Sequence, residues 1–400
     1  MAEIIELEDQ IEKVILVGVS EQDGDDAEDS VAELAELVRT AGAVVVGTLI
    51  QKRELMHPGT YVGTGKVAEI AAMIAERGAT GIVCDDELSP AQLKNLEQML
   101  DTKVMDRTLI ILDIFAARAT TSEGKIQVEL AQLKYRLSRL TGLGRSMSRL
   151  GGGIGTRGPG EKKLEMDRRL IHERIGQLMS ELEEVKRHRD VIRKQREKAH
   201  TPVAAIVGYT NAGKSTLLNQ MTGSDVYVQD QLFATLDAVS RRIETAEHTP
   251  FLLVDTVGFI RKLPHALVSA FRSTLEEAVL ADVLVIVNDG ASEEITQQHD
   301  TVVQVLSDLG ATEQPRIEVI NKCDLYTDEA GAPMLIPGAV RLSAKTGEGI
   351  AELHARIAEQ LQKTYAPVTF VLPFDRFGGE RDFSFIIPLP PYDFFILRRL

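Results

Sequence analysis

The sequence predicts an α/β protein with three parts: a parallel α/β domain, a long α-helical hairpin, and a second α/β domain built around a phosphate-binding loop. Three observations support this. Apolar segments alternate with helical ones through the first 124 residues, as in a parallel sheet. Residues 161–198 keep helical periodicity without a proline. The apolar run 203–207 then leads through a glycine-rich loop into a helix start.

Composition bounds the class of protein. The chain has 400 residues, of which 44% are hydrophobic and 26% are charged, as in a soluble globular protein. Its two cysteines, Cys84 and Cys323, cannot build a disulfide framework, and they lack the spacing of zinc ligands. The amino terminus does not resemble a signal peptide, and no apolar run approaches the roughly 18 residues of a membrane helix. We expect a cytoplasmic protein without a membrane span.

The charge is unevenly distributed. The formal net charge is −15, which by itself argues against a nucleic-acid partner. Residues 125–198, however, hold 19 Lys and Arg against 10 Asp and Glu, a local balance of +9. The sequence therefore predicts one basic element on an acidic body.

The first domain, residues 1–124, should contain four strands and four helices. Ser89 and Pro90 form a clear helix start, with serine at the N-cap and proline at the first helical position. The expected strands cover 14–19, 44–50, 81–85 and 103–106, and the expected helices cover 30–39, 66–77, 90–100 and 108–119.

A short G-x-G-K segment, Gly63 to Lys66, opens one of these helices. It could hold a second nucleotide at the helix amino terminus. A lone G-x-G-K is a weak signal, and a tight turn that caps a helix is the more ordinary interpretation.

The second part, residues 125–199, should be a basic hairpin of two antiparallel helices. A helix over 125–140 leads into a glycine-laden loop, and a second helix from Glu161 to Lys198 would be about 57 Å long. Apolar residues recur on this second helix at helical spacing: Leu164, Ile171, Ile175, Leu178, Leu182 and Val185. The alternative is a solvated coiled coil whose charges only maintain solubility. If the hairpin binds RNA, the candidate contacts are Arg145, Arg149, Arg157, Arg168, Arg169, Lys186 and Arg187.

The third part, residues 200–364, begins with a phosphate-binding loop at 208–215. Glycines let backbone N–H groups face phosphate oxygens, Lys214 supplies charge to the β- and γ-phosphates, and Ser215 offers Mg²⁺ a hard oxygen ligand. The expected nucleotide contacts here are Gly208, Asn211, Ala212, Gly213, Lys214, Ser215 and Thr216.

Two later segments should complete the phosphate and metal site. Thr235 lies in a loop that could reach Mg²⁺, and Asp255 ends an apolar strand, where its carboxylate could hold the ion through water. The Gly258 N–H could meet the γ-phosphate, so Lys214, Thr235 and Gly258 are the expected catalytic groups. Phe259 occupies the position where many GTPases carry the glutamine that orients water.

The base is indicated by two further segments. Asn321-Lys322-Cys323-Asp324 follows an apolar strand, and Asp324 can accept two hydrogen bonds from guanine that adenine cannot donate. The Lys322 stem could lie along the base, and the Ala344 N–H, after Ser343, could meet guanine O6. With the phosphate-binding loop and Asp255-Thr256-Val257-Gly258, these segments stand in the unpermuted order of a Ras-like G domain. We expect GTP or GDP, with Mg²⁺.

With Asp106-Arg107-Thr108 and the glycine-rich segment from Ser148 to Glu161, this chain resembles the HflX family of ribosome-associated GTPases over roughly residues 10 to 372. The resemblance implies binding to the large ribosomal subunit, with the hairpin tip near the peptidyl-transferase region. It also implies dissociation or rescue of ribosomes under stress, and ATP binding by the amino-terminal domain. We expect a monomer.

Two alternatives stay open on the sequence: a GTP-gated ribosome assembly or storage factor, and an ATP-dependent RNA remodeller that acts through Gly63 to Lys66. The tail, residues 365–400, departs from the family. Seven of the twelve Phe residues lie between Phe370 and Leu400, and no function is assigned to them.

Overall fold

A computed structural model describes residues 11–20, 26–148, 159–199, 201–223, 232–233, 239–244, 250–263, 272–325 and 336–363. The chain divides into two compact units, which are described separately. The first comprises Met1–Lys186, Gln229–Asp237 and Ile260–Ser273, and the second comprises Arg187–Val228, Ala238–Phe259 and Thr274–Leu400. Thr235 and the tail after Lys363 lie outside the described residues.

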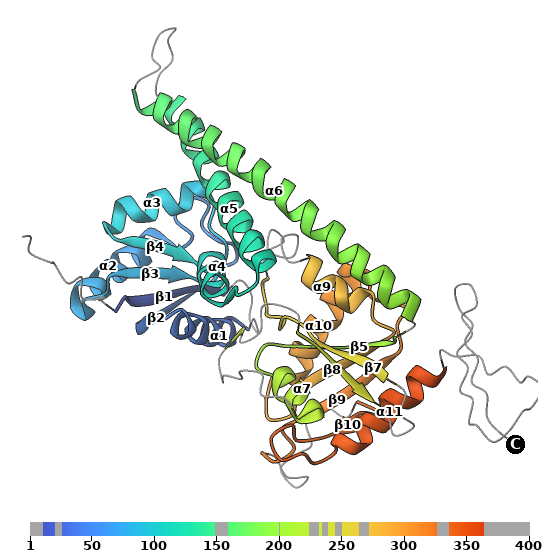
Figure 1. The fold of residues 1–400 in the computed structure, drawn as a ribbon. Helices are drawn as coiled ribbons and strands as arrows, with labels where there is room; N and C mark the ends of the chain where they lie inside the picture. The colour runs from blue at the N-terminus through green and yellow to red at the C-terminus, as the bar shows by residue number, and fades with distance from the viewer. Residues whose placement is uncertain are drawn as a thin grey trace, which may run out of the picture. The chain divides into compact units, whose positions relative to one another are not determined.

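The first unit contains a four-stranded parallel sheet in the order β2-β1-β3-β4 (Figure 1). Helices α1 and α4 contact each other on one face, and α2 and α3 contact each other on the other. The predicted α/β domain is confirmed, and its elements agree with the expected ranges to within a few residues. The strands are β1 Lys13–Ser20, β2 Val44–Lys52, β3 Gly81–Cys84 and β4 Lys103–Asp106, and the helices are α1 Ala27–Thr40, α2 Thr64–Arg77, α3 Pro90–Leu100 and α4 Arg107–Arg118.

Local chemistry explains where two of these helices begin. Ser89 and Gln92 form a reciprocal capping box at α3, with Pro90 in the first turn. Asp106 caps α4 by accepting the Leu109 amide at 3.0 Å. The same fully buried carboxylate accepts the Tyr135 hydroxyl at 2.6 Å. Asp106 therefore fixes the start of α4 and ties it to the helix that carries Tyr135.

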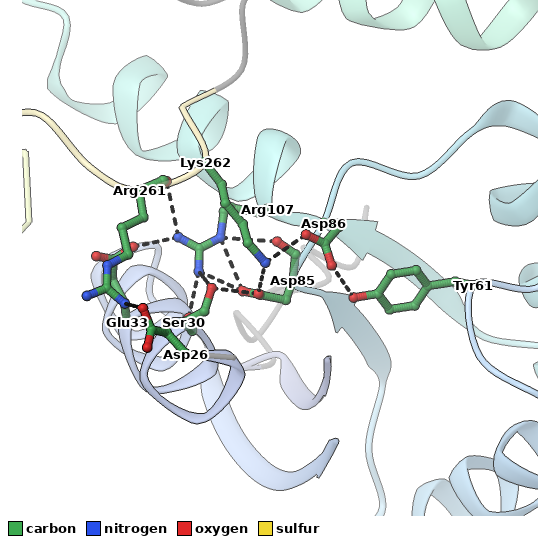
Figure 2. A network of polar contacts seen from close by, with 9 residues as sticks. All are labelled: Asp26, Ser30, Glu33, Tyr61, Asp85, Asp86, Arg107, Arg261 and Lys262. Atoms are coloured by element: carbon green, nitrogen blue, oxygen red, sulfur yellow. Dashed lines mark hydrogen bonds and ion pairs between the residues drawn. The ribbon is translucent and has the colours of Figure 1, made fainter. Parts of the chain in front are cut away.

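A buried polar network lies at the carboxyl end of β3 (Figure 2). At its centre is Arg107, which is 1% exposed and contacts Asp85 at 2.6 Å and Glu33 at 2.6 Å. Lys262, from the segment of this unit that begins at Ile260, contacts Asp85 at 2.6 Å and Asp86 at 2.7 Å. Burial alone would raise the pKa of Asp85, but the charges of Arg107 and Lys262 hold that pKa below its usual value.

Two long helices follow, α5 Ser122–Ser148 and α6 Pro159–Ala199, which run side by side (Figure 1). The expected end of the first helix at residue 140 was wrong, because α5 continues eight residues further. Arg174 of α6 donates to both carboxylate oxygens of Glu129 on α5, at 2.8 and 3.0 Å. Leu178 is 1% exposed, and the described members of the predicted apolar stripe are buried or half-buried. Among the described residues, no helix is both long and apolar enough to cross a membrane.

The second unit contains a six-stranded sheet in the order β10-β9-β8-β5-β7-β6, parallel except for β6. Strand β6 was not expected, because its exposed arginines obscure the alternation of Val239 and Ile243 toward the core. The strands are β5 Val203–Gly208, β6 Val239–Glu244, β7 Pro250–Asp255, β8 Val283–Asp289, β9 Arg316–Asn321 and β10 Val340–Arg341. The helices are α7 Lys214–Thr222, α9 Arg272–Val279, α10 Ile295–Leu309 and α11 Ile350–Lys363. Parallel strands bring the ends of β5, β7, β8 and β9 to one edge of the sheet.

Candidate nucleotide-binding site

The loop between β5 and α7 packs so closely that two of its positions require glycine. A Cβ on Gly208 would lie 2.3 Å from the Val287 carbonyl oxygen, and one on Gly213 would lie 2.2 Å from Asn321 Nδ2. Gly213 also has φ +91°, in the left-handed region. Asn321 donates to the Ala212 carbonyl at 2.8 Å, which joins this loop to the end of β9. The predicted phosphate-binding loop and the Asn321 segment therefore meet.

Lys214 lies in the first turn of α7 and is 6% exposed. Its Nζ donates to the Tyr209 carbonyl at 2.7 Å. Burial lowers the pKa of Lys214 to about 8, an effect that Asp255 partly offsets. A Cβ on Gly258 would lie 2.8 Å from Lys214 Nζ, so the two groups expected at the γ-phosphate are neighbours. This arrangement places the Lys214 ammonium beside the close-packed backbone of Gly258.

Ser215 and Asp255 contact each other directly, since the Ser215 hydroxyl donates to Asp255 Oδ2 at 2.7 Å. Both are at least nine-tenths buried. A hydroxyl and a carboxylate at this spacing are a donor set that suits Mg²⁺, with the remaining ligands supplied by water and phosphate. The residues present fit the ion, and Thr235, the third expected ligand, lies outside the described residues.

The expected base-recognition residues also gather at the edge of this sheet. Asp324 is exposed, and a hydrogen bond of 2.6 Å from the Ser343 hydroxyl holds the pKa of Asp324 below its usual value. It stays ionised at neutral pH, as an acceptor for guanine must be. The Ala344 N–H donates to Asn321 Oδ1 at 2.9 Å, which ties the two base-recognition segments together, and its contact with guanine O6 stays a prediction.

Two residues that the sequence analysis did not single out also belong to this site. Asp289, at the end of β8, accepts Lys322 Nζ at 2.7 Å, while Lys322 has φ +63°. The sequence did carry a signal for Asp289, because this carboxylate stands at the end of a buried strand. Thr210, in the phosphate-binding loop, is 6% exposed and donates its amide to the Phe259 carbonyl at 2.7 Å. The sequence carried no signal for Thr210, because the phosphate-binding-loop pattern specifies no residue type at its position.

The second candidate loop lies in the first unit. The Gly63 amide donates to Gln51 Oε1 at 2.8 Å, and Lys66 Nζ pairs with Glu69 of the same helix at 2.6 Å. The Gly63 amide and the Lys66 ammonium, which could have contacted a phosphate, instead contact Gln51 and Glu69. Such contacts are those of a turn that starts a helix.

Family models match three successive segments of the chain. They are described as "GTP-binding GTPase N-terminal" over residues 28–116, "GTP-binding GTPase Middle Region" over 118–196 and "50S ribosome-binding GTPase" over 203–322. GTPase HflX of Lacrimispora saccharolytica is 60% identical over 356 residues, which are 88% of this chain and 84% of that protein. The chain belongs to the GTPase HflX family. GTPase HflX of Escherichia coli is 45% identical over 368 residues, 90% of this chain and 86% of that one.

Among solved structures, a GTP-binding protein from Sulfolobus solfataricus in complex with GDP is 25% identical. The match covers 88% of this chain and 99% of that one, with a TM-score of 0.44. Its membership of the GTPase HflX family and its match to a GTPase domain model make this protein a GTP hydrolase with a guanine-nucleotide-binding G domain. The predicted fold class and family resemblance are confirmed.

The expected RNA-contact residues are dispersed along the two long helices. Arg169 and Arg187 are exposed on α6, whereas Arg168 and Lys186 are half-buried. The backbone of Arg145 lies within α5, rather than in the loop expected there. Arg149 and Arg157 lie outside the described residues.

Proposed function

We propose that this HflX-family GTPase binds the large ribosomal subunit in its GTP-bound state and releases it after hydrolysis to GDP and phosphate. Dissociating or rescuing ribosomes under stress is the task that fits such a cycle. The protein would act in the cytoplasm as a monomer, with Mg²⁺ at Ser215, Thr235 and Asp255. The chain would comprise an amino-terminal domain over 1–124, a hairpin over 125–199, a G domain over 200–364 and a tail over 365–400.

In this proposal the G domain supplies the switch. The phosphate-binding loop holds the triphosphate, and Asp324 and Lys322 hold the base. GTP and Mg²⁺ order the loops around Thr235 and Gly258, and loss of the γ-phosphate releases them. Lys214, Thr235 and Gly258 would stabilise the charge that develops on the transferred phosphoryl group.

The choice of an RNA partner rests on the positive charge balance of residues 125–198, which hold 19 Lys and Arg against 10 Asp and Glu. The described members of the predicted apolar stripe on α6 are buried or half-buried, and Arg174 pairs with Glu129 of α5, which fixes the helix pair. Arg169 is left with its side chain 80% exposed, and Arg187 is exposed as well. Long exposed cations on a chain of net charge −15 indicate a polyanionic partner. The family description as a 50S ribosome-binding GTPase supports ribosomal RNA as that partner.

The test is sedimentation of the full-length protein with purified large subunits, in GTP, in a non-hydrolysable GTP analogue and in GDP. We expect co-sedimentation with the two triphosphates only. Binding should fall steeply with salt, since each phosphate contact steepens the log–log slope by roughly 0.7 to 0.9.

A matched pair of variants localises the contact. Arg169→Glu should weaken subunit binding and flatten the salt slope. Arg39→Glu reverses a comparable surface arginine, since Arg39 and Arg169 are both more than half exposed and each pairs with a glutamate about one helical turn away. It should leave binding unchanged. Equal loss in both variants would show only a general charge effect, and binding that ignores the nucleotide would contradict the gated cycle.

The assembly or storage alternative differs in its need for hydrolysis. A ribosome-dissociating factor should turn over many ribosomes in GTP, but only one for each protein molecule in the non-hydrolysable analogue. A storage factor should keep subunits apart equally well in both.

A further inference from the structure

Thr210 lies inside the phosphate-binding loop, and the nucleotide chemistry described above makes no use of it. Its side chain is 6% exposed, yet its hydroxyl has no hydrogen-bond partner among the residues that the structure describes. An unmatched buried hydroxyl costs about 1–3 kcal/mol of desolvation. That cost is removed if a ligand oxygen accepts the hydroxyl hydrogen.

The backbone around Thr210 leaves the hydroxyl as its remaining donor. The Thr210 amide donates to the Phe259 carbonyl at 2.7 Å, and the Phe259 amide donates to the Gly208 carbonyl at 3.0 Å. This pair of hydrogen bonds holds the segment after Asp255 against the phosphate-binding loop. The Phe259 side chain is 1% exposed and apolar, so it cannot orient water.

The neighbours of Thr210 indicate which ligand atom it would meet. A Cβ on Gly258 would lie 2.9 Å from both Thr210 Cα and Thr210 Cγ2, and 2.8 Å from Lys214 Nζ. Thr210 and the Lys214 ammonium thus both lie close to the point that a Gly258 side chain would occupy, so the three groups are neighbours. A phosphoryl oxygen that accepts from both Lys214 and the Gly258 amide would lie beside Thr210.

We infer that Thr210 is a further catalytic residue, whose hydroxyl donates a hydrogen bond to a γ-phosphoryl oxygen as negative charge gathers there in the transition state. The water oxygen forms a bond to the γ-phosphorus while the bond from that phosphorus to the bridging oxygen breaks. GDP leaves, and both hydrogens of the water end on the inorganic phosphate, which is released as dihydrogen phosphate. The Thr210 hydroxyl keeps its proton throughout and acts by stabilising charge.

The test uses the full-length protein in single-turnover GTP hydrolysis, with and without large subunits, beside equilibrium affinities for GTP and GDP. Thr210→Val removes the hydroxyl but keeps the shape, and should slow hydrolysis about 10- to 100-fold, as expected for a hydrogen bond to a charged group. GDP affinity should stay within about twofold, because GDP has no γ-phosphate. Thr210→Ser keeps the hydroxyl and should retain most of the rate.

Thr60→Val is the matched control for losing a buried threonine hydroxyl. Thr60 is also 6% exposed, but its hydroxyl donates to the Val62 carbonyl at 2.7 Å in the first unit. Thr60→Val should reduce stability and leave hydrolysis unchanged. Thr210→Val should not lower the stability of the nucleotide-free protein and should raise it, because no hydrogen bond among described residues is lost and an unmatched buried hydroxyl is removed.

Three results would overturn the inference: hydrolysis by Thr210→Val at the parent rate, an equal loss of GDP affinity, or a Thr210→Ser rate as low as that of Thr210→Val. The inference rests on the assignment of this loop to GTP, but not on the ribosomal partner. Suppose that the parent protein fails to bind large subunits while Thr210→Val still slows hydrolysis. That combination would refute the proposed function but not the role of Thr210.

Discussion

Replacing Arg107 by methionine removes the cation at the centre of the buried network in the first unit while keeping much of its apolar volume. The Arg107 side chain is 2% exposed and donates to Asp85, to Glu33 and to the Ser30 carbonyl at 2.6 Å (Figure 2). The carboxylates of Asp85 and Glu33 have exposed fractions of only 2% and 12%. After the substitution they stay buried without their main counter-charge.

Breaking a buried ion pair by removing one partner typically destabilises by 3–5 kcal/mol, because the other charge stays buried. Asp85 retains Lys262 at 2.6 Å and the Ser30 hydroxyl at 2.7 Å, so we expect the lower end, about 3 kcal/mol. The pKa of Asp85 is held below its usual value in the folded protein, so its stabilisation is present at neutral pH. That stabilisation is lost as the pH falls through the folded-state pKa.

Two compact units make a single global unfolding free energy ill-defined, so the measurement must be local. Native-state hydrogen exchange of the full-length protein reports the opening free energy of each strand. About 3 kcal/mol corresponds to exchange roughly 150-fold faster for amides of β1 and β3. Amides of β8, in the second unit, serve as the internal reference and should keep their rate.

Arg39→Met is the matched control, because Arg39 forms an ion pair with Glu36 on α1 but both side chains are about 60% exposed. Such a pair contributes at most about 1 kcal/mol. The reasoning is refuted if Arg107→Met accelerates exchange in β1 and β3 no more than Arg39→Met does. The double variant Arg107→Met with Asp85→Asn should cost less than the sum of the single changes, since one of the two orphaned charges is then removed.

Three further predictions concern the nucleotide site. Asp324→Asn should weaken GTP binding and shift preference toward xanthosine triphosphate, because an amide can donate to the xanthine 2-carbonyl; unchanged guanine preference in competition binding would contradict base recognition by this residue. Asp289→Asn should release the Lys322 ammonium and so weaken GTP and GDP binding equally, on the order of tenfold. An effect confined to hydrolysis would disprove this positioning role of Asp289. GTP affinity should fall as the pH rises above about 8, where free Lys214 loses its proton, and a pH-independent affinity between 7 and 9.5 would show that its charge is not used.

The parallel strands and the guanine-nucleotide segments could be predicted because their signals are local. The apolar run before Gly208 and the apolar run before Asn321 each predict a buried strand, and in a parallel sheet their carboxyl ends meet at one edge. Close packing then demanded glycine at Gly213, whose absent Cβ makes room for Asn321. Strand β6 escaped prediction because an edge strand with exposed arginines carries a weak alternating pattern.

Sequence alone indicated the order of the three parts, the family and the expected guanine base, since each depends on residues close together in the chain. The tertiary structure alone decided which polar groups share a partner. Arg107 joins Ser30, Glu33 and Asp85, which are 77, 74 and 22 residues away along the chain, and no pattern in the sequence pairs them. The lack of a described partner for the Thr210 hydroxyl is likewise a property of packing, because burial and hydrogen bonding depend on segments that meet only in the folded chain.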